Sequence, residues 1–147
     1  MFTSPIGPLR FAASDAGLTR VCFEGEPLPI DEPSVSPLVT QELAEYFAGT
    51  RQKFTVPLDL GRVTDFRTAV LRKLEKVPYG ETTTYAELAR AVGNPKAVRA
   101  VGSACATNPL PLFIPCHRVL RSDGQLGGYR GGVEAKRFLL RMEGIDV

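Results

Sequence analysis

The segment Thr84–Thr107, TYAELARAVGNPKAVRAVGSACAT, decides the fold of the carboxyl-terminal part of this chain. Its first four residues, TYAE, have the form of a capping box, in which a threonine hydroxyl and a glutamate carboxylate satisfy free amides at a helix start. This first helix should end at Gly93. Asn94 is the expected N-cap of a second helix, with Pro95 at its first position, and that helix runs to the end of the segment. The segment therefore predicts two short helices joined by a turn, a helix-turn-helix.

The second helix carries two basic residues, Lys96 and Arg99, among small side chains. An arginine near the start of an exposed helix can reach a phosphate or enter a base stack, or it is a solvated surface charge. Small side chains let another backbone approach closely, either that of a partner or that of a neighbouring helix. These small residues are Ala97, Ala100, Gly102, Ser103 and Ala104. The pattern alone fits both DNA binding and internal packing.

Helical patterns lie on both sides of this segment. Upstream, apolar residues recur at helical spacing from Phe66 to Val77, and Pro78 ends that helix. Downstream, a last helix is expected over Val133–Met142, with Gly144 as its cap.

The first sixty residues predict a small α/β unit. A hairpin is expected between Leu9–Ala13 and Leu18–Phe23, because turn residues separate two apolar runs. A proline-rich connection, Glu26–Pro37, follows it. A helix over Leu38–Ala48 and one more strand over Phe54–Leu58 complete the unit.

Charge divides the chain into the same two parts. Residues 1–60 hold four Lys/Arg and eight Asp/Glu, net −4, whereas residues 61–147 hold fourteen and eight, net +6. Helical periodicity begins where the charge changes, so we place the boundary of a 1–60 and a 61–147 domain near Leu60–Thr64. A basic domain is typical of a polyanion binder, although a solvated basic face gives the same excess.

Composition limits the class of protein. The chain has 147 residues, 44% hydrophobic and 23% charged, which is typical of a soluble globular protein without a membrane span. Its start resembles no secretory signal, so we expect a cytoplasmic protein. Three cysteines without a C-x-x-C pair and a single histidine argue against a disulfide framework or a zinc site. The thiols should be free.

A reactive cysteine follows a rigid apolar run. Asn108–Pro115 contains three prolines, is expected to be a buried, strand-like segment, and leads into Cys116 and His117. A cysteine attacks only as thiolate, so it needs a base or a positive environment, and His117 is the one imidazole available. If the segment is extended, a water must bridge the two side chains; direct contact requires a turn. Glu143 could orient the histidine, or it is a solvated helix end. A buried cysteine beside a core histidine is the alternative.

A glycine-rich segment, Gly127–Gly132, lies between the reactive cysteine and the last helix, after a turn at Arg121–Gly124. Uncovered backbone amides there would let an anion or a planar ligand approach. A surface loop without a ligand is the alternative.

The pentapeptide Pro115–Val119, PCHRV, closely resembles the O6-methylguanine-DNA methyltransferase family, which repairs alkylated guanine by moving the alkyl group to its own cysteine. Further segments resemble the family in the family's order: Pro78–Thr82, Thr84-Tyr85, Gly93–Gly102, Asn108-Pro109 and Gly128–Gly132. Ser4–Leu9 and Ala13–Leu18 resemble its opening hairpin. The resemblance implies an α/β (α+β) fold, with a small ribonuclease H-like amino-terminal domain and a winged-helix, helix-turn-helix carboxyl-terminal domain.

The resemblance also implies roles in the chemistry. Cys116 matches the alkyl acceptor, His117 the group that activates it through a water, and Glu143 the carboxylate that holds the histidine. Tyr85 matches the acid that assists guanine as leaving group. Asn108 matches the residue that ties the helix-turn-helix to the reactive segment.

Other residues match DNA and base contacts of the family. The second helix is similar to a recognition helix that lies in the minor groove, and Arg99 matches the arginine that replaces the flipped-out base. The expected DNA contacts are Arg99, Lys96, Ala97, Ala100 and Gly102. The expected base pocket consists of Cys105, Val119, Tyr129 and Arg130, with the Arg130 amide near the alkylated oxygen and the Val119 carbonyl near the guanine amine. Cys105 replaces a larger apolar residue.

The function implied is single-turnover repair of O6-alkylguanine, and less efficiently of O4-alkylthymine, in duplex DNA. The family's zinc ligands have no counterparts here, so we expect no metal and no cofactor. The partner is double-stranded DNA bearing alkylated guanine, bound by a monomer, with cooperativity on DNA left open; a membrane and a transcriptional role are not expected. Two alternatives remain: a lesion sensor, in whose relatives tryptophan replaces the cysteine, and a cysteine hydrolase using Cys116, His117 and Glu143.

Overall fold

The computed structural model describes residues 1–28, 35–61 and 65–147. These residues form two compact units, Met1–Gly61 and Arg62–Val147, which we describe one at a time. The prolines at 29 and 33 and most of the expected boundary region lie outside the described residues.

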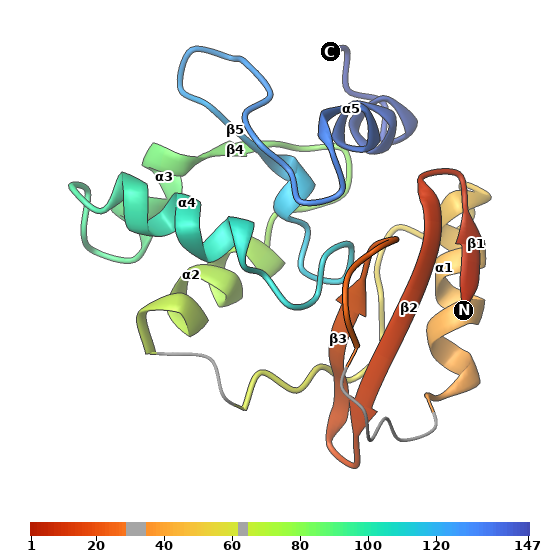
Figure 1. The fold of residues 1–147 in the computed structure, drawn as a ribbon. Helices are drawn as coiled ribbons and strands as arrows, with labels where there is room; N and C mark the ends of the chain where they lie inside the picture. The colour runs from red at the N-terminus through yellow and green to blue at the C-terminus, as the bar shows by residue number, and fades with distance from the viewer. Residues whose placement is uncertain (29–34, 62–64) are drawn as a thin grey trace. The chain divides into compact units, whose positions relative to one another are not determined.

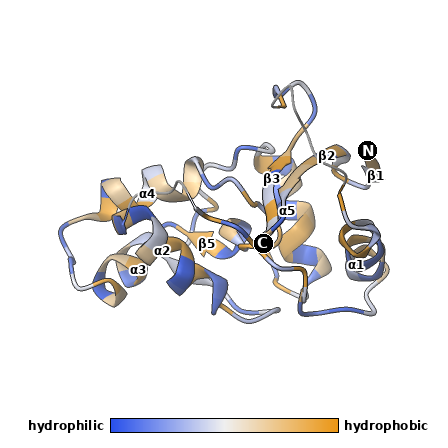
Figure 2. Ribbon diagram, turned by 90° about the horizontal axis from the view of Figure 1, so that it is seen from below, coloured by the Kyte–Doolittle hydropathy of each residue, from blue (hydrophilic) through white to orange (hydrophobic). Residues whose placement is uncertain are grey.

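The first unit contains a three-stranded antiparallel sheet in the order β1-β2-β3 (Figure 1). Its strands are β1 (Phe2–Ser4), β2 (Gly7–Ser14) and β3 (Gly17–Cys22). The hairpin predicted from the sequence is therefore confirmed, and β1 extends it by one strand. The buried residues of these two strands are apolar, and Figure 2 colours much of both strands as hydrophobic. They are Leu9, Phe11 and Ala12 of β2 and Leu18, Val21 and Cys22 of β3.

Helix α1 (Pro37–Phe47) packs on this sheet, where the ring of Phe47 stacks on Phe2 with centroids 6.2 Å apart. The side chain of Ser36 caps the helix by accepting from the amide of Leu38 at 3.2 Å. Gly49 follows its end with φ +81°, so the predicted helix and its stop are both confirmed.

The strand predicted at Phe54–Leu58 is wrong; only Leu58 makes an isolated bridge, to Leu18. The buried carboxylate of Glu42 accepts hydrogen bonds from the amides of Thr55 at 2.7 Å and Val56 at 3.1 Å. In a strand these amides would be available to a β-ladder. Pro57 then has no amide to offer. The segment is therefore held by the Glu42 side chain and by two backbone hydrogen bonds at Leu18, whose amide donates to the Pro57 carbonyl and whose carbonyl accepts from the Asp59 amide, rather than by a continuous ladder.

The second unit is mainly helical. Its helices are α2 (Asp65–Glu75), α3 (Tyr85–Ala91), α4 (Val98–Ala106) and α5 (Val133–Met142). A short parallel pair, β4 (Thr83–Thr84) and β5 (Val119–Leu120), joins the start of α3 to the chain that follows Cys116. Each predicted helix is present, and α5 has the predicted bounds.

The helix-turn-helix differs from the prediction at two points. Thr84 caps α3 by accepting from the amide of Glu87 at 3.1 Å, but the Glu87 carboxylate accepts from the Thr83 hydroxyl instead of closing the box. Helix α4 begins at Val98, because residues 94–97 form a separate turn in which the Ala97 amide donates to the Asn94 carbonyl. Lys96 and Ala97 therefore precede the helix.

The run before Cys116 is a folded turn, and the extended segment expected there is wrong. The Ile114 amide donates to the Leu110 carbonyl at 2.8 Å, and Leu112 has φ +76°. The prolines prevent a regular ladder here, because they lack amide hydrogens. A 3₁₀ helix, Cys116–Arg118, follows directly.

Gly17 should be indispensable to the first unit. Its φ is +151°, and a Cβ there would lie 2.5 Å from the Pro57 carbonyl oxygen. We expect Gly17→Ala to lower the free energy of unfolding by more than about 2 kcal/mol, since it combines backbone strain with a clash. Gly7→Ala is the matched control, because Gly7 also has positive φ but open space around it. Equal losses in urea unfolding would contradict this prediction.

Candidate active site

Cys116 lies at the first position of the 3₁₀ helix, and its side chain is buried. The turn before it is organised by the side chain of Asn108. The Asn108 amide nitrogen donates to the Ile114 carbonyl at 2.9 Å, and its oxygen accepts from the Leu110 amide at 2.9 Å. Asn108 thus sets the direction in which the chain presents the thiol.

His117 and Glu143 lie together although 26 residues separate them. Nε2 of His117 and Oε2 of Glu143 are 2.7 Å apart, and both side chains are fully buried. Arg118 binds the same carboxylate through two nitrogens, at 2.8 and 3.0 Å, and donates to the Val77 carbonyl at 2.8 Å. This two-pronged contact fixes the orientation of the carboxylate.

These contacts determine the protonation of the pair. Burial opposes ionisation of Glu143, but hydrogen bonds from His117 and Arg118 outweigh it and lower its pKa to about 2. Burial lowers the pKa of His117, and Arg118 adds to this effect against the pull of Glu143. The histidine is therefore neutral at neutral pH and donates its one ring proton, on Nε2, to an ionised carboxylate.

The other ring nitrogen of His117 is consequently a proton acceptor. Nδ1 is buried and has no hydrogen-bond partner among the described residues. A neutral imidazole held in this tautomer, next to a cysteine, can act as a general base. The 3₁₀ helix Cys116–Arg118 shows that the chain turns at Cys116 and His117, which the sequence alone did not decide.

The surroundings of Cys116 act on its thiol in opposite directions. Burial raises the pKa of Cys116 above its usual range. A hydrogen bond with Asn108, the positive charges of Arg130 and Lys136, and its own backbone amide lower it. The thiol is therefore protonated at rest, in surroundings that favour the thiolate once a base removes the proton.

Cys116 opens onto a cavity of about 430 Å³. Small side chains of α4 form one wall, and the glycine-rich segment forms another. The lining residues are Tyr85, Gly102, Cys105, Ala106, Cys116, Gly128, Tyr129 and Arg130. The cavity thus gathers Tyr85, Cys105, Tyr129 and Arg130 of the predicted residues, whereas Val119 is fully buried outside this lining.

Tyr85 stays protonated in this cavity. Burial and the nearby thiols of Cys105 and Cys116 raise its pKa to about 12. Gly127 allows the close approach of this ring, since a Cβ there would lie 3.2 Å from the tyrosine hydroxyl oxygen. A phenol with a high pKa, held beside a thiol, can donate a proton or a hydrogen bond.

The sequence reading missed Lys136. Its side chain is fully buried, and Nζ donates to the carbonyls of Val119 at 2.6 Å and Gly128 at 3.3 Å. Burial lowers its pKa to about 8, which the thiols of Cys116 and Cys105 partly oppose. A signal was present, because Lys136 and Glu143 share the helical face of buried Leu139 and Leu140.

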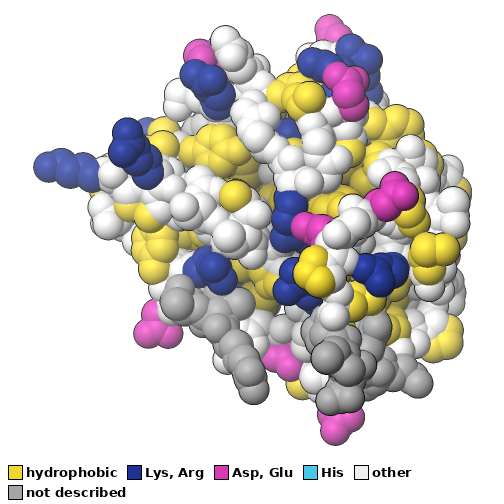
Figure 3. Space-filling model, in the orientation of Figure 1, with side chains coloured by type: hydrophobic (Ala, Val, Ile, Leu, Met, Phe, Trp, Pro, Cys, Tyr) yellow, Lys and Arg dark blue, Asp and Glu magenta, His cyan; other side chains and the backbone are white. Residues whose placement is uncertain are grey.

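Most of the predicted DNA contacts lie on the surface, at the start of α4 and in the turn before it. Lys96, Arg99 and Ala100 are exposed, and Val98 beside them is 39% exposed. Figure 3 shows basic side chains projecting around the α3–α4 turn. Gly102 is half-buried and lines the cavity, one turn after Arg99 on the same side of α4. Helix α4 therefore connects an exposed basic end to the cavity wall.

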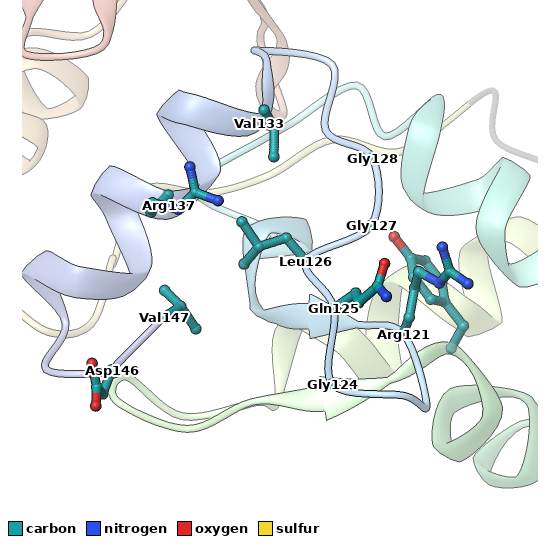
Figure 4. Close-up of a pocket in the computed structure, with 11 residues that line it drawn as sticks. Arg121, Gly124, Gln125, Leu126, Gly127, Gly128, Val133, Arg137, Asp146 and Val147 are labelled. Carbon is teal, nitrogen blue, oxygen red and sulfur yellow. The ribbon is translucent and has the colours of Figure 1, made fainter.

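A larger, more open cavity of about 870 Å³ lies across the glycine-rich segment. It shares Tyr85 and Gly128 with the first cavity. Figure 4 shows Leu126, Val133 and Arg137 on one side of the loop and Arg121 on the other. No cysteine or histidine is among the residues that line it, whereas Cys116 lines the smaller cavity.

Within the described residues, no group of three or more His, Cys, Asp or Glu side chains is placed to hold a metal ion. No helix in the described part of the chain is both long enough and apolar enough to span a membrane.

Two family models match the chain. One, described as 6-O-methylguanine DNA methyltransferase, ribonuclease-like domain, matches residues 1–60. The other, 6-O-methylguanine DNA methyltransferase, DNA binding domain, matches residues 65–145.

Relatives match over nearly the full chain. A Methanosarcina acetivorans protein named methylated-DNA--protein-cysteine methyltransferase is 41% identical, covering 98% of this chain and 96% of its own. The crystal structure of Mycobacterium tuberculosis OGT in complex with DNA has a TM-score of 0.90 and 41% identity, covering 97% of this chain and 89% of its own. S. pombe Atl1 in complex with DNA containing O6-carboxymethylguanine matches less, with a TM-score of 0.53, 33% identity and coverage of 58% and 81%.

Removing the charge of Glu143 should destabilise the fold. We expect Glu143→Gln to cost about 3–5 kcal/mol at pH 7, because it leaves Arg118 buried without its anion. Glu134→Gln is the control, since that exposed carboxylate pairs only with Arg137 and should cost less than about 1 kcal/mol.

The stabilisation by Glu143 should depend on pH in a defined direction. The pKa of Glu143 is lowered from 4.5 to about 2, so its stabilisation is present above pH 4.5 and lost as the pH falls toward 2. The stability difference between the parent protein and Glu143→Gln should shrink across that window in denaturant titrations. A constant difference would contradict the assignment.

Proposed function

The chain belongs to the 6-O-methylguanine DNA methyltransferase family, and from this membership we propose that it repairs alkylated guanine in DNA by transferring the alkyl group to its own Cys116. The resemblance drawn from the sequence is thereby confirmed, as is the expected fold class. The single observation that carries the residue assignment is the neutral His117, held by ionised Glu143, beside a thiol that opens onto a cavity.

The proposed reaction begins with proton removal from Cys116. A water between the thiol and Nδ1 of His117 relays the proton, and Glu143 stabilises the imidazolium that forms. The thiolate attacks the alkyl carbon on O6 of guanine, so a carbon–sulfur bond forms as the carbon–oxygen bond breaks. Tyr85 donates a proton to the departing guanine. Because the pKa of Tyr85 is raised to about 12, this proton moves while the carbon–oxygen bond breaks and not before.

The balance of the reaction makes it a single turnover. Cys116 and the alkylated base become a thioether and an ordinary guanine, and the proton lost by sulfur is the one that guanine gains overall. A thioether has no leaving group that a base could release, so each molecule acts once. No cofactor enters these steps.

Helix α4 is proposed as the DNA-binding helix. Its exposed end carries Arg99 and Ala100, with Lys96 in the preceding turn, and Gly102, one turn further along, lines the Cys116 cavity. A base must leave the duplex to reach a buried thiol, and Arg99 would take its place in the stack. Ala97 and Ala100 leave room for the sugar-phosphate backbone.

The cavity is proposed to hold the flipped base. Tyr129 and the main chain of Arg130 would cover it, while Cys105 leaves more room near the alkyl group than a longer side chain would. The Val119 carbonyl, already an acceptor from Lys136, has a second lone pair for the guanine amine. Asn108 holds the reactive turn.

The cellular setting is proposed from the cysteines. Cys22, Cys105 and Cys116 are all free and buried, which suits a reducing compartment such as the cytoplasm. We propose a monomer acting on double-stranded DNA, with O6-alkylguanine as the main substrate and O4-alkylthymine as a poorer one.

Mass spectrometry tests the chemistry. We expect one methyl group on the Cys116 peptide after mixing with a duplex that contains O6-methylguanine, saturating at one per protein. Cys116→Ser should remove the adduct because its hydroxyl is a weak nucleophile, whereas Cys105→Ser should keep it, since burial raises the pKa of that thiol to about 12. Tight binding without an adduct would point to a sensor, and repeated turnover to a hydrolase.

Arg99 provides a separate test of base flipping. We expect Arg99→Ala to slow repair of a duplex about tenfold or more, because flipping costs a few kcal/mol that the arginine offsets. Reaction with the free base O6-methylguanine should change little. Arg141→Ala, which removes another exposed arginine, is the control. Equal slowing with both substrates would place Arg99 in the chemistry instead.

A further inference from the structure

The glycine-rich segment 127–132 has two side chains of its own, those of Tyr129 and Arg130. Four of its six residues are glycines, which have no side chain with which to anchor the loop. Within the segment, the Gly132 amide donates to the Tyr129 carbonyl at 2.9 Å. Two cations tie it to the rest of the unit: Lys136 donates to the Gly128 carbonyl at 3.3 Å, and Arg130 donates to the Asn108 carbonyl at 2.5 Å.

The Arg130 contact joins this loop to the residue that shapes the reactive turn. Asn108 holds the carbonyl of Ile114 and the amide of Leu110 with its side chain, and its own carbonyl accepts from Arg130. Arg130 also lines the cavity onto which Cys116 opens. The Arg130 side chain therefore connects the glycine-rich loop to Asn108, the residue that organises the turn before Cys116.

Titratable groups lie around Cys116 on each element next to it. They are Tyr85 on α3, Cys105 on α4, Tyr129 and Arg130 on the loop, Lys136 on α5, and His117 beside the cysteine with its partner Glu143 at the end of α5. Tyr85, Tyr129, Cys105 and His117 are uncharged at neutral pH, and Glu143 is committed to His117 and Arg118.

The two cations that act on the thiol, Arg130 and Lys136, differ in whether they keep their charge at alkaline pH. Lys136 has its pKa lowered to about 8 by burial, so it loses charge in the range where a thiol titrates. An arginine keeps its charge throughout. The charge of Arg130 lowers the pKa of Cys116 against the effect of burial.

We propose that the Arg130 side chain is a positioning residue for Cys116, fastening the glycine-rich loop to Asn108 across the cavity and holding a permanent positive charge near the sulfur. The family resemblance assigned only the main chain of Arg130. The inference deepens the proposed function, because it concerns how the buried thiol becomes the thiolate that this reaction needs.

The test uses a small alkylating reagent on the whole protein without DNA. The rate at which iodoacetamide modifies the Cys116 peptide is measured from pH 6 to pH 11 in the parent protein, Arg130→Met and Arg130→Lys. We expect the fraction of the plateau rate reached at pH 8 to fall about tenfold in Arg130→Met, corresponding to about one pH unit. Arg130→Lys should recover most of it, because the charge is kept.

The control is Arg72→Met, which removes an arginine that is half exposed on α2 and pairs with Glu75. Its pH profile should match the parent protein. A looser loop alone would raise the plateau rate without moving the profile, so an unmoved profile in Arg130→Met would overturn the proposal. A profile in Arg130→Lys equal to that of Arg130→Met would also overturn it, since charge would then be irrelevant.

Single-turnover transfer from an O6-methylguanine duplex is measured with the same proteins. We expect Arg130→Met to be about tenfold slower at pH 8 and Arg130→Lys to be partly rescued; equal rates in all three would count against the proposal. If the parent protein itself transferred no methyl group, the proposed function would fail, while the iodoacetamide profile would still decide the role of Arg130.

Discussion

The contacts of one buried carboxylate, that of Glu143, connect the parts of the second unit that the reaction depends on. It meets the ring of His117 at 2.7 Å and the guanidinium of Arg118 at 2.8 Å, and it accepts weakly from the Gly80 amide at 3.4 Å. The end of α5, the 3₁₀ helix and the chain before β4 are thereby joined at a single charged group. A charge this deeply buried is tolerated because donors surround it, and the same donors fix the tautomer of the histidine.

Burial has two opposite effects on the function proposed for the Cys116 thiol. Burial excludes water from Cys116 and so protects an acceptor that can be used only once, but it also disfavours the thiolate. The base His117, the amide of Asn108 and the nearby cations oppose that effect without exposing the sulfur. Reactivity is therefore set by the arrangement around the cysteine rather than by an exposed, permanently ionised thiolate.

Helix α4 contributes both to the exposed surface and to the lining of the Cys116 cavity, and most of its side chains are small. An exposed face with Arg99 and Ala100 is available to DNA, while Gly102 and Cys105 line the cavity. Because residues three apart share a face, Arg99 and the cavity-lining Gly102 lie one turn apart along the same side of this nine-residue helix. In the proposed function this arrangement lets a base that leaves the duplex reach the thiol beside the proposed DNA-binding helix.

The sequence by itself predicted the helices and the hairpin, because periodicity, caps and turn residues are local, and it singled out Cys116 as the candidate alkyl acceptor, because the PCHRV motif is specific. It failed at Phe54–Leu58 and Asn108–Pro115, where hydrogen bonds to the side chains of Glu42 and Asn108 replace a ladder. Only the tertiary structure decided that Lys136 lies beside the thiol, since helical periodicity places it on the buried face of α5 but cannot show which distant residues that face meets.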